Sequence, residues 1–350
     1  MFWINLPLVA VTIYLTLRAV RESRDPDAYH GVDWAGIGLS AAGLGGPVFA
    51  LIEQPTRGWG DPVVWVPLAA GLACAALFVL HEGRARYPML DLALFGVRNF
   101  AVANLTTLAA YAGLIGGLFF VGLYLQQVIG YTPLQAGLAT TPISVLIFAL
   151  SPHFGRVASG VGPRLPMSLE PIVGGTGLVL MLRVDPDSGY LGDVLPAVLV
   201  FGLGLSATVA PLTATVLDSV SENRVGVASG VNNGVSRVAG LVAIAVLGAM
   251  ISAQFGANLD EELGSRPLAP AALAAIDEAK AQPLAVPDRD ELPAGEAERV
   301  RVAAADASTS AFHLGALLAG LLMVAGGLVA WFGLAPRSPG RVGVSPEPRG

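Results

Sequence analysis

The sequence predicts an all-α membrane protein with about nine transmembrane helices. Of its 350 residues, 54% are hydrophobic and 13% are charged, whereas a soluble domain usually carries about 25% charged residues. The hydrophobic residues come in long blocks, each near the ~20 residues that a helix needs to cross a ~30 Å hydrocarbon core. Because no segments of about ten residues alternate strictly, as barrel strands do, we expect every span to be a helix.

The blocks and their connectors follow a regular order along the chain. The connector at 254–308 is rich in Ala, Pro and acidic residues, so we expect a flexible loop there, interrupted by a short surface helix at 270–282. The nine candidate spans are 1–18, 34–52, 63–80, 100–125, 134–151, 165–182, 191–217, 227–253 and 309–335.

Arginine is concentrated in every second connector, and this bias predicts the orientation. Among the other short connectors, only Arg57 and Arg183 are basic. The positive-inside rule therefore places the arginine-rich connectors and the 336–350 tail in the cytoplasm of a cell, with Met1 and the 254–308 loop outside. The arginines concerned are Arg18, Arg21, Arg24, Arg84, Arg86, Arg98, Arg156, Arg164, Arg224, Arg237, Arg337, Arg341 and Arg349.

The first span begins at Met1 without a preceding charged segment, and an odd number of spans leaves the termini on opposite sides of the membrane. No small-residue cleavage site follows the apolar run, so it does not have the form of a signal peptide. We therefore expect the chain to be a fragment or to have a misplaced start.

Short motifs in a consistent order resemble one transporter family. They are FWINLP (2–7), DWAGIGLSAAG (33–43), GWGDP (58–62), PMLDLALFGVRNFAVAN (88–104), YLQQVIGYTPLQAGLATTP (124–142), GRVASGVGPR (155–164) and GVASGVNNGVSRVAGLVAIAVLG (226–248). In this order they resemble the EmrB/QacA-type family, the 14-helix drug:proton antiporters of the major facilitator superfamily, from about the sixth helix onward. GLGGPV (43–48) looks like the antiporter motif of that family, but it lies in the wrong helix and is interpreted as packing.

The resemblance implies a fold and a function. Residues 1–18 would be the last helix of a truncated N-terminal bundle, 19–99 would hold two extra linker helices, and 100–335 would be the complete C-terminal six-helix bundle. The family exports small hydrophobic or cationic compounds in exchange for protons. Without its N-terminal helices, or a partner chain in their place, this chain would not transport. The alternatives are a non-transporting subunit or scaffold, the product of a truncated gene, and, more weakly, a membrane enzyme in which Glu170, Asp218 and His153 cluster.

Several polar residues within the predicted spans are candidates for the transport site. Asn232, Asn233 and Arg237 share one span, and an ionisable residue inside a membrane is a functional candidate by default. Arg237 pairing with Asp218 would form a gate or clamp, although Arg237 near the interface would simply snorkel.

Further candidates lie in other spans. Gln126 and Gln127 either line a drug cavity or cap a helix at the headgroup level. Glu170 is a candidate proton carrier because burial lets a carboxylate load and release protons; the alternative is a solvated side chain near the cytoplasm. Glycines four residues apart let membrane helices approach closely, for packing or for sliding; they are Gly113 and Gly117, and Gly226, Gly230 and Gly234.

Other classes of site are not indicated. The histidines at 30, 81, 153 and 313 lack the spacing of a metal site, and the single cysteine, Cys74, excludes a cysteine cluster. No basic stripe points to nucleic acid, and no P-loop, HExxH or GxSxG motif points to an enzyme. We expect no cofactor and no metal; the expected partners are the lipid bilayer, protons and the exported compounds.

Overall fold

The computed structural model is helical, with no strand among the residues it describes. These are residues 5–19, 32–85, 88–221, 224–264, 268–280, 282, 284–287, 292 and 295–335, with the backbone alone at 158–159 and 207–213. The helices are α1 (Asn5–Ala19), α2 (Trp34–Arg57), α3 (Pro62–Glu82), α4 (Arg98–Gln127), α5 (Pro133–Val161), α6 (Arg164–Leu180), α7 (Leu195–Asp218), α8 (Val225–Leu263), α9 (Pro270–Lys280) and α10 (Ala297–Gly333).

Each of the nine predicted spans coincides with one of these helices. Within the described chain, seven helices are long and apolar enough to cross a membrane: α2, α3, α4, α5, α6, α8 and α10. The two remaining predicted spans, 1–18 and 191–217, contain shorter apolar helices. These are α1 (Asn5–Ala19) and the stretch Tyr190–Ser206, which includes the first half of α7. The predicted all-α membrane fold is confirmed.

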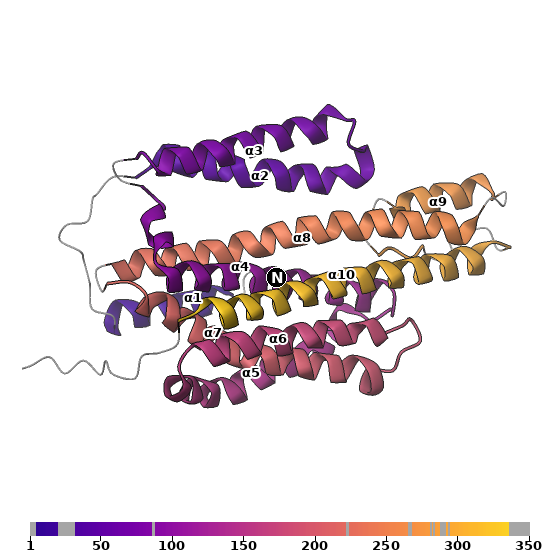
Figure 1. The fold of residues 1–350 in the computed structure, drawn as a ribbon. Helices are drawn as coiled ribbons and strands as arrows, with labels where there is room; N and C mark the ends of the chain where they lie inside the picture. The colour runs from indigo at the N-terminus through magenta and orange to yellow at the C-terminus, as the bar shows by residue number, and fades with distance from the viewer. Residues whose placement is uncertain are drawn as a thin grey trace, which may run out of the picture.

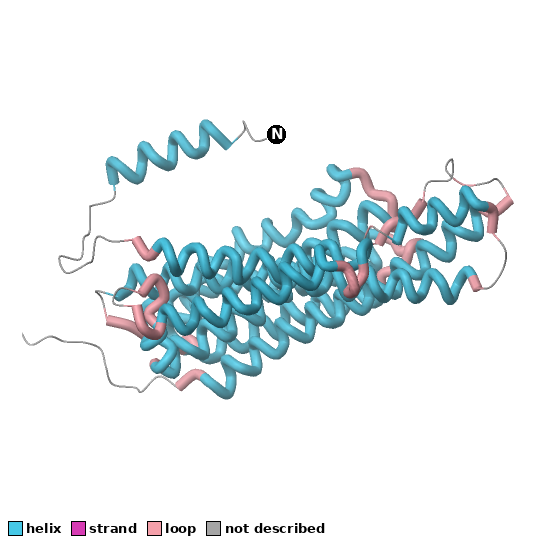
Figure 2. Tube along the Cα trace, turned by 90° about the horizontal axis from the view of Figure 1, so that it is seen from above, coloured by secondary structure: helices cyan, strands magenta, loops and turns pink. Residues whose placement is uncertain are grey.

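Six helices form one bundle, and a hairpin of two more packs on its side (Figure 1). The bundle consists of α4, α5, α6, α7, α8 and α10, and the α2–α3 hairpin lies beside α8. Half of the residues in the α6 span are buried, whereas only 11% of those in the α3 span are buried. α6 is therefore enclosed by protein, while most of α3 is left exposed to the lipid. α1 lies apart from the bundle and buries none of its residues (Figure 2).

Close contacts between backbones hold the enclosed helices together. A methyl group on Gly175 of α6 would lie 2.5 Å from the carbonyl oxygen of Gly320 in α10. One on Gly204 of α7 would overlap the backbone nitrogen of Gly174 in α6. Glycine at these crossings lets the helices approach to a distance that any side chain would prevent, as is usual where helices pack inside membranes.

The 254–308 connector is more helical than predicted. α8 continues to Leu263 and α10 begins at Ala297, so both ends of the expected flexible loop belong to long helices. Phe255 and Leu259 on α8 and Val300 on α10 are fully buried, so these extensions continue the hydrophobic core of the bundle. The prediction of a loop was wrong there, because alanine both favours helix and permits close packing.

The short surface helix predicted at 270–282 is confirmed by α9, which lies beside the far ends of α8 and α10 (Figure 1). Ile276 of α9 is buried in the same core. Lys280 at the end of α9 forms an ion pair with Asp260 of α8. The described part of the 254–308 connector is therefore a packed cap on one end of the bundle.

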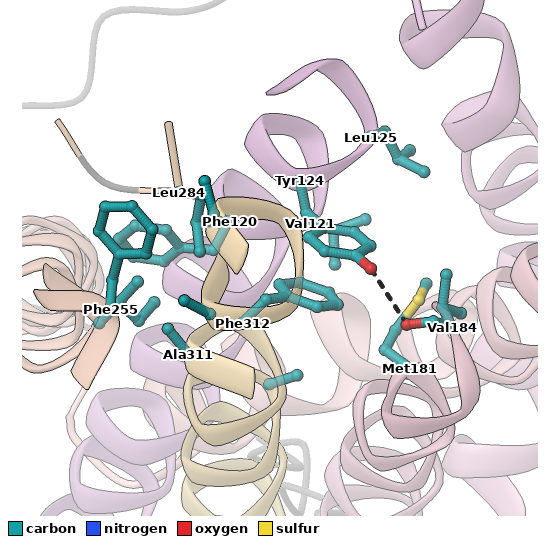
Figure 3. Close-up of a cluster of buried hydrophobic side chains, with 14 of the residues drawn as sticks. Phe120, Val121, Tyr124, Leu125, Met181, Val184, Phe255, Leu284, Ala311 and Phe312 are labelled. Atoms are coloured by element: carbon teal, nitrogen blue, oxygen red, sulfur yellow. Dashed lines mark hydrogen bonds between the residues drawn. The ribbon is translucent and has the colours of Figure 1, made fainter. Parts of the chain in front are cut away.

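An aromatic pair joins α4 to α10 near this cap. The rings of Tyr124 and Phe312 stack with centroids 4.1 Å apart, and they face each other in Figure 3. The Tyr124 hydroxyl lies 3.3 Å from the carbonyl oxygen of Val184, to which it donates, and 3.1 Å from Thr309 Oγ1. His313 Nε2 lies 3.0 Å from the same carbonyl oxygen of Val184. The turn that follows α6 is thus fixed to both helices.

Arginines gather at the opposite end of the bundle. Arg98, which begins α4, donates from Nε to the carbonyl oxygen of Gly333 at 2.8 Å. Arg164, which begins α6, donates to the carbonyl oxygen of Trp331 at 2.7 Å and lies over the Trp331 ring, 4.8 Å from its centroid. Both side chains satisfy carbonyls that the last turn of α10 leaves without partners inside the helix.

Candidate functional site

A buried polar cluster joins α8 to α4. Asn232 Nδ2 donates to Thr107 Oγ1 at 2.8 Å and to Asn104 Oδ1 at 3.2 Å. Asn104 and Thr107 in turn donate to carbonyl oxygens of their own helix, those of Phe100 and Ala103. Asn232, predicted as a gating or cavity residue, is therefore fixed in a helix–helix contact. Asn104 and Thr107 were missed, although amides and hydroxyls in an apolar span are themselves a signal for such a bond.

The other polar residues of α8 face outward from this contact. Asn233 and Arg237 are both exposed, and Asn233 Nδ2 donates to the carbonyl oxygen of Ser229 in its own helix. Asn233 and Arg237 thus lie on one exposed face of the helix, as their spacing predicts.

The predicted ion pair between Arg237 and Asp218 does not form. No ion pair within 4 Å joins these two exposed residues, both of which the structure describes. Asp218 ends α7, whereas Arg237 lies twelve residues, or about 18 Å, along α8 from Val225. The partner of a basic residue at the start of α8 is instead Asp91, whose Oδ2 lies 3.2 Å from Arg224 Nη1.

Glu170 is buried rather than solvated. Its exposed fraction is 4%, and its carbonyl oxygen lies where a side chain on Gly204 of α7 would be, 2.8 Å from the Cβ position. The close packing of α6 against α7 removes Glu170 from solvent although it lies only six residues from the start of α6. The solvated alternative is therefore wrong, and the role of Glu170 as a proton carrier stays a prediction.

The two glutamines end α4 and lie at the surface. Gln126 is exposed and donates from Nε2 to the carbonyl oxygen of Gly122. Gln127 lines a small cleft of about 210 Å³ together with Glu278 of α9 and Gln282. Both residues thus lie beside the cap formed by α9, where the headgroup level is expected, and neither points into the bundle core.

The predicted glycine pairs divide into two groups. A methyl group on Gly113 would overlap the carbonyl oxygen of Ala319 in α10, and one on Gly117 would lie 2.6 Å from Leu178 in α6, so both are packing positions. Around Gly226, Gly230 and Gly234 no atom of the described chain lies within 4 Å of the Cβ position. The expected close contact is absent there because the α2–α3 hairpin, although it contacts α8, leaves the space beside these glycines unfilled.

The base of the α2–α3 hairpin holds a second set of charged side chains that sequence reasoning did not single out. Asp33 caps α2 by accepting from the Gly36 N–H at 2.8 Å, and His81 Nε2 lies 3.0 Å from each Asp33 carboxylate oxygen. The Gly36 bond chiefly, and His81 in addition, hold the pKa of Asp33 below its ordinary value of 3.8, while partial burial opposes them. Glu82 is buried and accepts from the Leu90 N–H at 2.9 Å, which ties α3 to the segment before α4.

The clustering that would favour a membrane enzyme is not seen. Glu170 is buried in α6, whereas His153 is exposed on α5 and Asp218 is exposed at the end of α7. Among the described residues, no group of three or more His, Cys, Asp or Glu side chains is placed to hold a metal ion.

GLGGPV (43–48) serves helix packing, as the sequence predicts. A methyl group on Gly43 would lie 2.9 Å from the backbone nitrogen of Ala75 in α3, and one on Gly46 would overlap the carbonyl oxygen of Pro67. These contacts close the α2–α3 hairpin.

Comparison with known proteins shows which family this chain resembles. Residues 1–244 match the family described as the Major Facilitator Superfamily. The chain is 32% identical over 262 residues to the multidrug resistance protein Stp of Mycobacterium tuberculosis, covering 75% of this chain and 48% of that protein. It is 29% identical over 334 residues to the tetracenomycin C resistance and export protein of Streptomyces glaucescens, covering 95% of this chain and 62% of that protein.

A third relative is the cephamycin export protein CmcT of Amycolatopsis lactamdurans, 33% identical over 252 residues, or 70% of this chain and 51% of that protein. The chain thus spans about half of the length of the curated relatives it matches, or somewhat more. The helical multi-pass architecture and the match over residues 1–244 lead to one conclusion: the chain belongs to the Major Facilitator Superfamily of membrane transporters.

Proposed function

We propose that this chain provides the C-terminal six-helix bundle and the two linker helices of an EmrB/QacA-type exporter with 14 helices. The observation that carries the proposal is the arrangement of the helices. The residues 100–335 supply one six-helix bundle, and the α2–α3 hairpin packs on its side. The exposed surface of α1 supports its assignment as the last helix of a second bundle.

The exported compounds are small and hydrophobic or cationic. Relatives of this chain are named for multidrug resistance and for the export of tetracenomycin C and cephamycin, which supports a drug-like substrate class. The exposed face of α8 with Asn233 and Arg237 is the polar surface of the bundle that would meet the second bundle. We assign Asn233 and Arg237 to a gate at that interface.

Export is driven by proton antiport, with Glu170 as the proton carrier in this half. A carboxylate with 4% exposure inside a membrane helix binds and releases protons readily when its surroundings alternate between wet and dry. The bundle lies in the cell membrane with the 336–350 tail in the cytoplasm. This orientation is supported by the arrangement of Arg98, Arg164 and Arg224 at the starts of α4, α6 and α8.

The test of proton coupling uses everted membrane vesicles that contain the full gene product, as read from the 5′ end of its transcript. Addition of a lipophilic cation should release protons in the wild type, whereas Glu170→Gln should abolish the release. Glu53→Gln changes a carboxylate that pairs with Arg57 on the surface of α2 and should leave proton release unchanged. Proton release that survives in Glu170→Gln would remove Glu170 from the mechanism.

A non-transporting membrane subunit is the second candidate function. It is favoured by one observation, that a single bundle, its α9 cap and the hairpin account for all α-helices of the described chain from α2 onward. A transcript that encodes about five further hydrophobic helices in frame supports the exporter. A transcript whose translation starts at Met1 behind its own ribosome-binding site supports the subunit.

A further inference from the structure

A large apolar cavity separates the α2–α3 hairpin from the bundle. Its volume is about 690 Å³, and it is bounded by α2, α3, α4, α8 and the segment before α4. Phe78 of α3 and Phe95 before α4 form two of its walls, and Gly230 and Gly234 of α8 form a third. Of the described residues that line it, Ser40 alone has a polar side chain.

The cavity exists because the hairpin contacts α8 without filling the space beside its glycines. No atom of the described chain lies within 4 Å of the Cβ positions of Gly230 and Gly234. Water is a poor occupant, because a buried water needs two to four polar partners and this lining offers almost none. An empty space of this size would lose dispersion contacts on every wall. The cavity is therefore suited to an apolar group.

The dimensions of the cavity match one leaflet of the bilayer. Its lining on α8 runs from Val227 to Val238, which corresponds to about 16 Å along the helix axis. This length is about half of the ~30 Å hydrocarbon thickness. The cavity is therefore about as long as one leaflet of the hydrocarbon region is thick.

One end of the cavity lies at a charged surface. Arg224 precedes Val227 by three residues, and its guanidinium pairs with Asp91 at 3.2 Å. The Arg224 side chain is 53% exposed, so it has donors left for an anion. A basic group at the mouth of an apolar slot complements a phosphate headgroup attached to an acyl chain.

We propose that this cavity binds one acyl chain of a membrane phospholipid, with the phosphate beside Arg224, and that the lipid acts as a wedge between the hairpin and the bundle. An exported cation is a poorer occupant, because no carboxylate lines the cavity to recognise its charge. The proposal concerns the space between α8 and the hairpin, and it uses neither Asn233 nor Arg237. The inference therefore does not depend on proton coupling or on transport.

The test counts the phospholipids that remain on the purified 350-residue chain by native mass spectrometry after mild delipidation. A double variant, Gly230→Leu with Gly234→Leu, fills the cavity from α8 and should retain one phospholipid fewer than the wild type. Gly226→Leu adds the same side chain to the same helix at a position that faces open space but does not line the cavity. It should retain as many lipids as the wild type.

Two further measurements keep the outcome clear. Val238→Phe fills the cavity from a position farther along α8 and should also lose one lipid, so a failure of the double variant to fold leaves the test intact. Tetraphenylphosphonium should not displace the retained lipid. Equal lipid counts in the wild type and the cavity-filling variants would overturn the proposal. Displacement of the lipid by tetraphenylphosphonium would overturn it in favour of a site for lipophilic cations.

Discussion

At the scale of single residues, the side-chain amide of Asn232 holds α8 against α4. Asn232→Ala removes its bonds to Asn104 and Thr107 and leaves Asn104 Oδ1 buried without that donor. We expect the free energy of unfolding to fall by about 1–2 kcal/mol, measured by denaturation with SDS in mixed micelles. The matched control is Asn233→Ala, since Asn233 is exposed and bonds only within its own helix. An equal loss in both variants would contradict this role of Asn232.

Gly113 provides a second test at this scale, because it lies at a crossing of two helices. Gly113→Ala places a methyl group against the carbonyl oxygen of Ala319, so α4 and α10 must separate. We expect a loss of about 1–3 kcal/mol in the free energy of unfolding, the usual cost of overpacking. Gly122→Ala on the same helix meets no atom within 4 Å and should be neutral or stabilising by up to about 1 kcal/mol. The same denaturation measurement ranks the two variants, and a loss in Gly122→Ala as large as that in Gly113→Ala would contradict the packing argument.

Whether a prediction for a single residue was correct depended on which partner the fold brings close to that residue. The small size of Gly113 marked it as a packing residue, whereas Asn232 was predicted to gate or line a cavity and its bonds to α4 were not predicted. The Arg237–Asp218 pair was wrong because proximity in the sequence did not account for the distance of Arg237 along α8. The burial of Glu170 depends on the crossing of α6 and α7 at Gly174 and Gly204, which no local pattern reveals.

At the scale of elements, the α2–α3 hairpin should loosen in acid. The lowered pKa of Asp33 means that its ionised form favours the folded hairpin. This contribution is present above the unfolded pKa, near 3.8, and is lost as the pH falls through the lower folded value. Hydrogen exchange of α2, corrected for the intrinsic rate, should therefore speed up below about pH 4.

Asp33→Asn is the matched variant for this prediction. Asparagine is as good an N-cap as aspartate, so the cap to Gly36 is kept while the charge beside His81 is lost. The acid-induced change in exchange should then disappear. An unchanged pH profile in Asp33→Asn would show that another group controls the hairpin.

The ranges of the helices could be predicted from hydropathy, because a span of about 20 apolar residues has few other structures open to it in a membrane. The ends of α8 and α10 could not be predicted, because they leave the apolar blocks. Their stability depends on burial of Phe255 and Val300 against each other's helices and against α9. That core forms only after the bundle has brought the helix ends together.

At the scale of the whole molecule, we propose that the chain is one half of a transporter. The bundle from α4 to α10 and the α2–α3 hairpin would then supply one wall of a central pathway, and alternating access would require a second bundle to rock against it. The arginine bias predicts which connectors face the cytoplasm, and this orientation stays a prediction. The sequence does not predict the substrate, because residues that line an apolar cavity are of the same types as residues that pack a core.

The most direct test of this account is proton-driven efflux from vesicles. The purified 350-residue chain is reconstituted into proteoliposomes that contain a fluorescent lipophilic cation, with helical content checked by circular dichroism, and a pH gradient is imposed. The account predicts no efflux above that of empty vesicles, and gradient-dependent efflux once the helices of the second bundle are reconstituted with the chain. Gradient-dependent efflux by the 350 residues alone would contradict it.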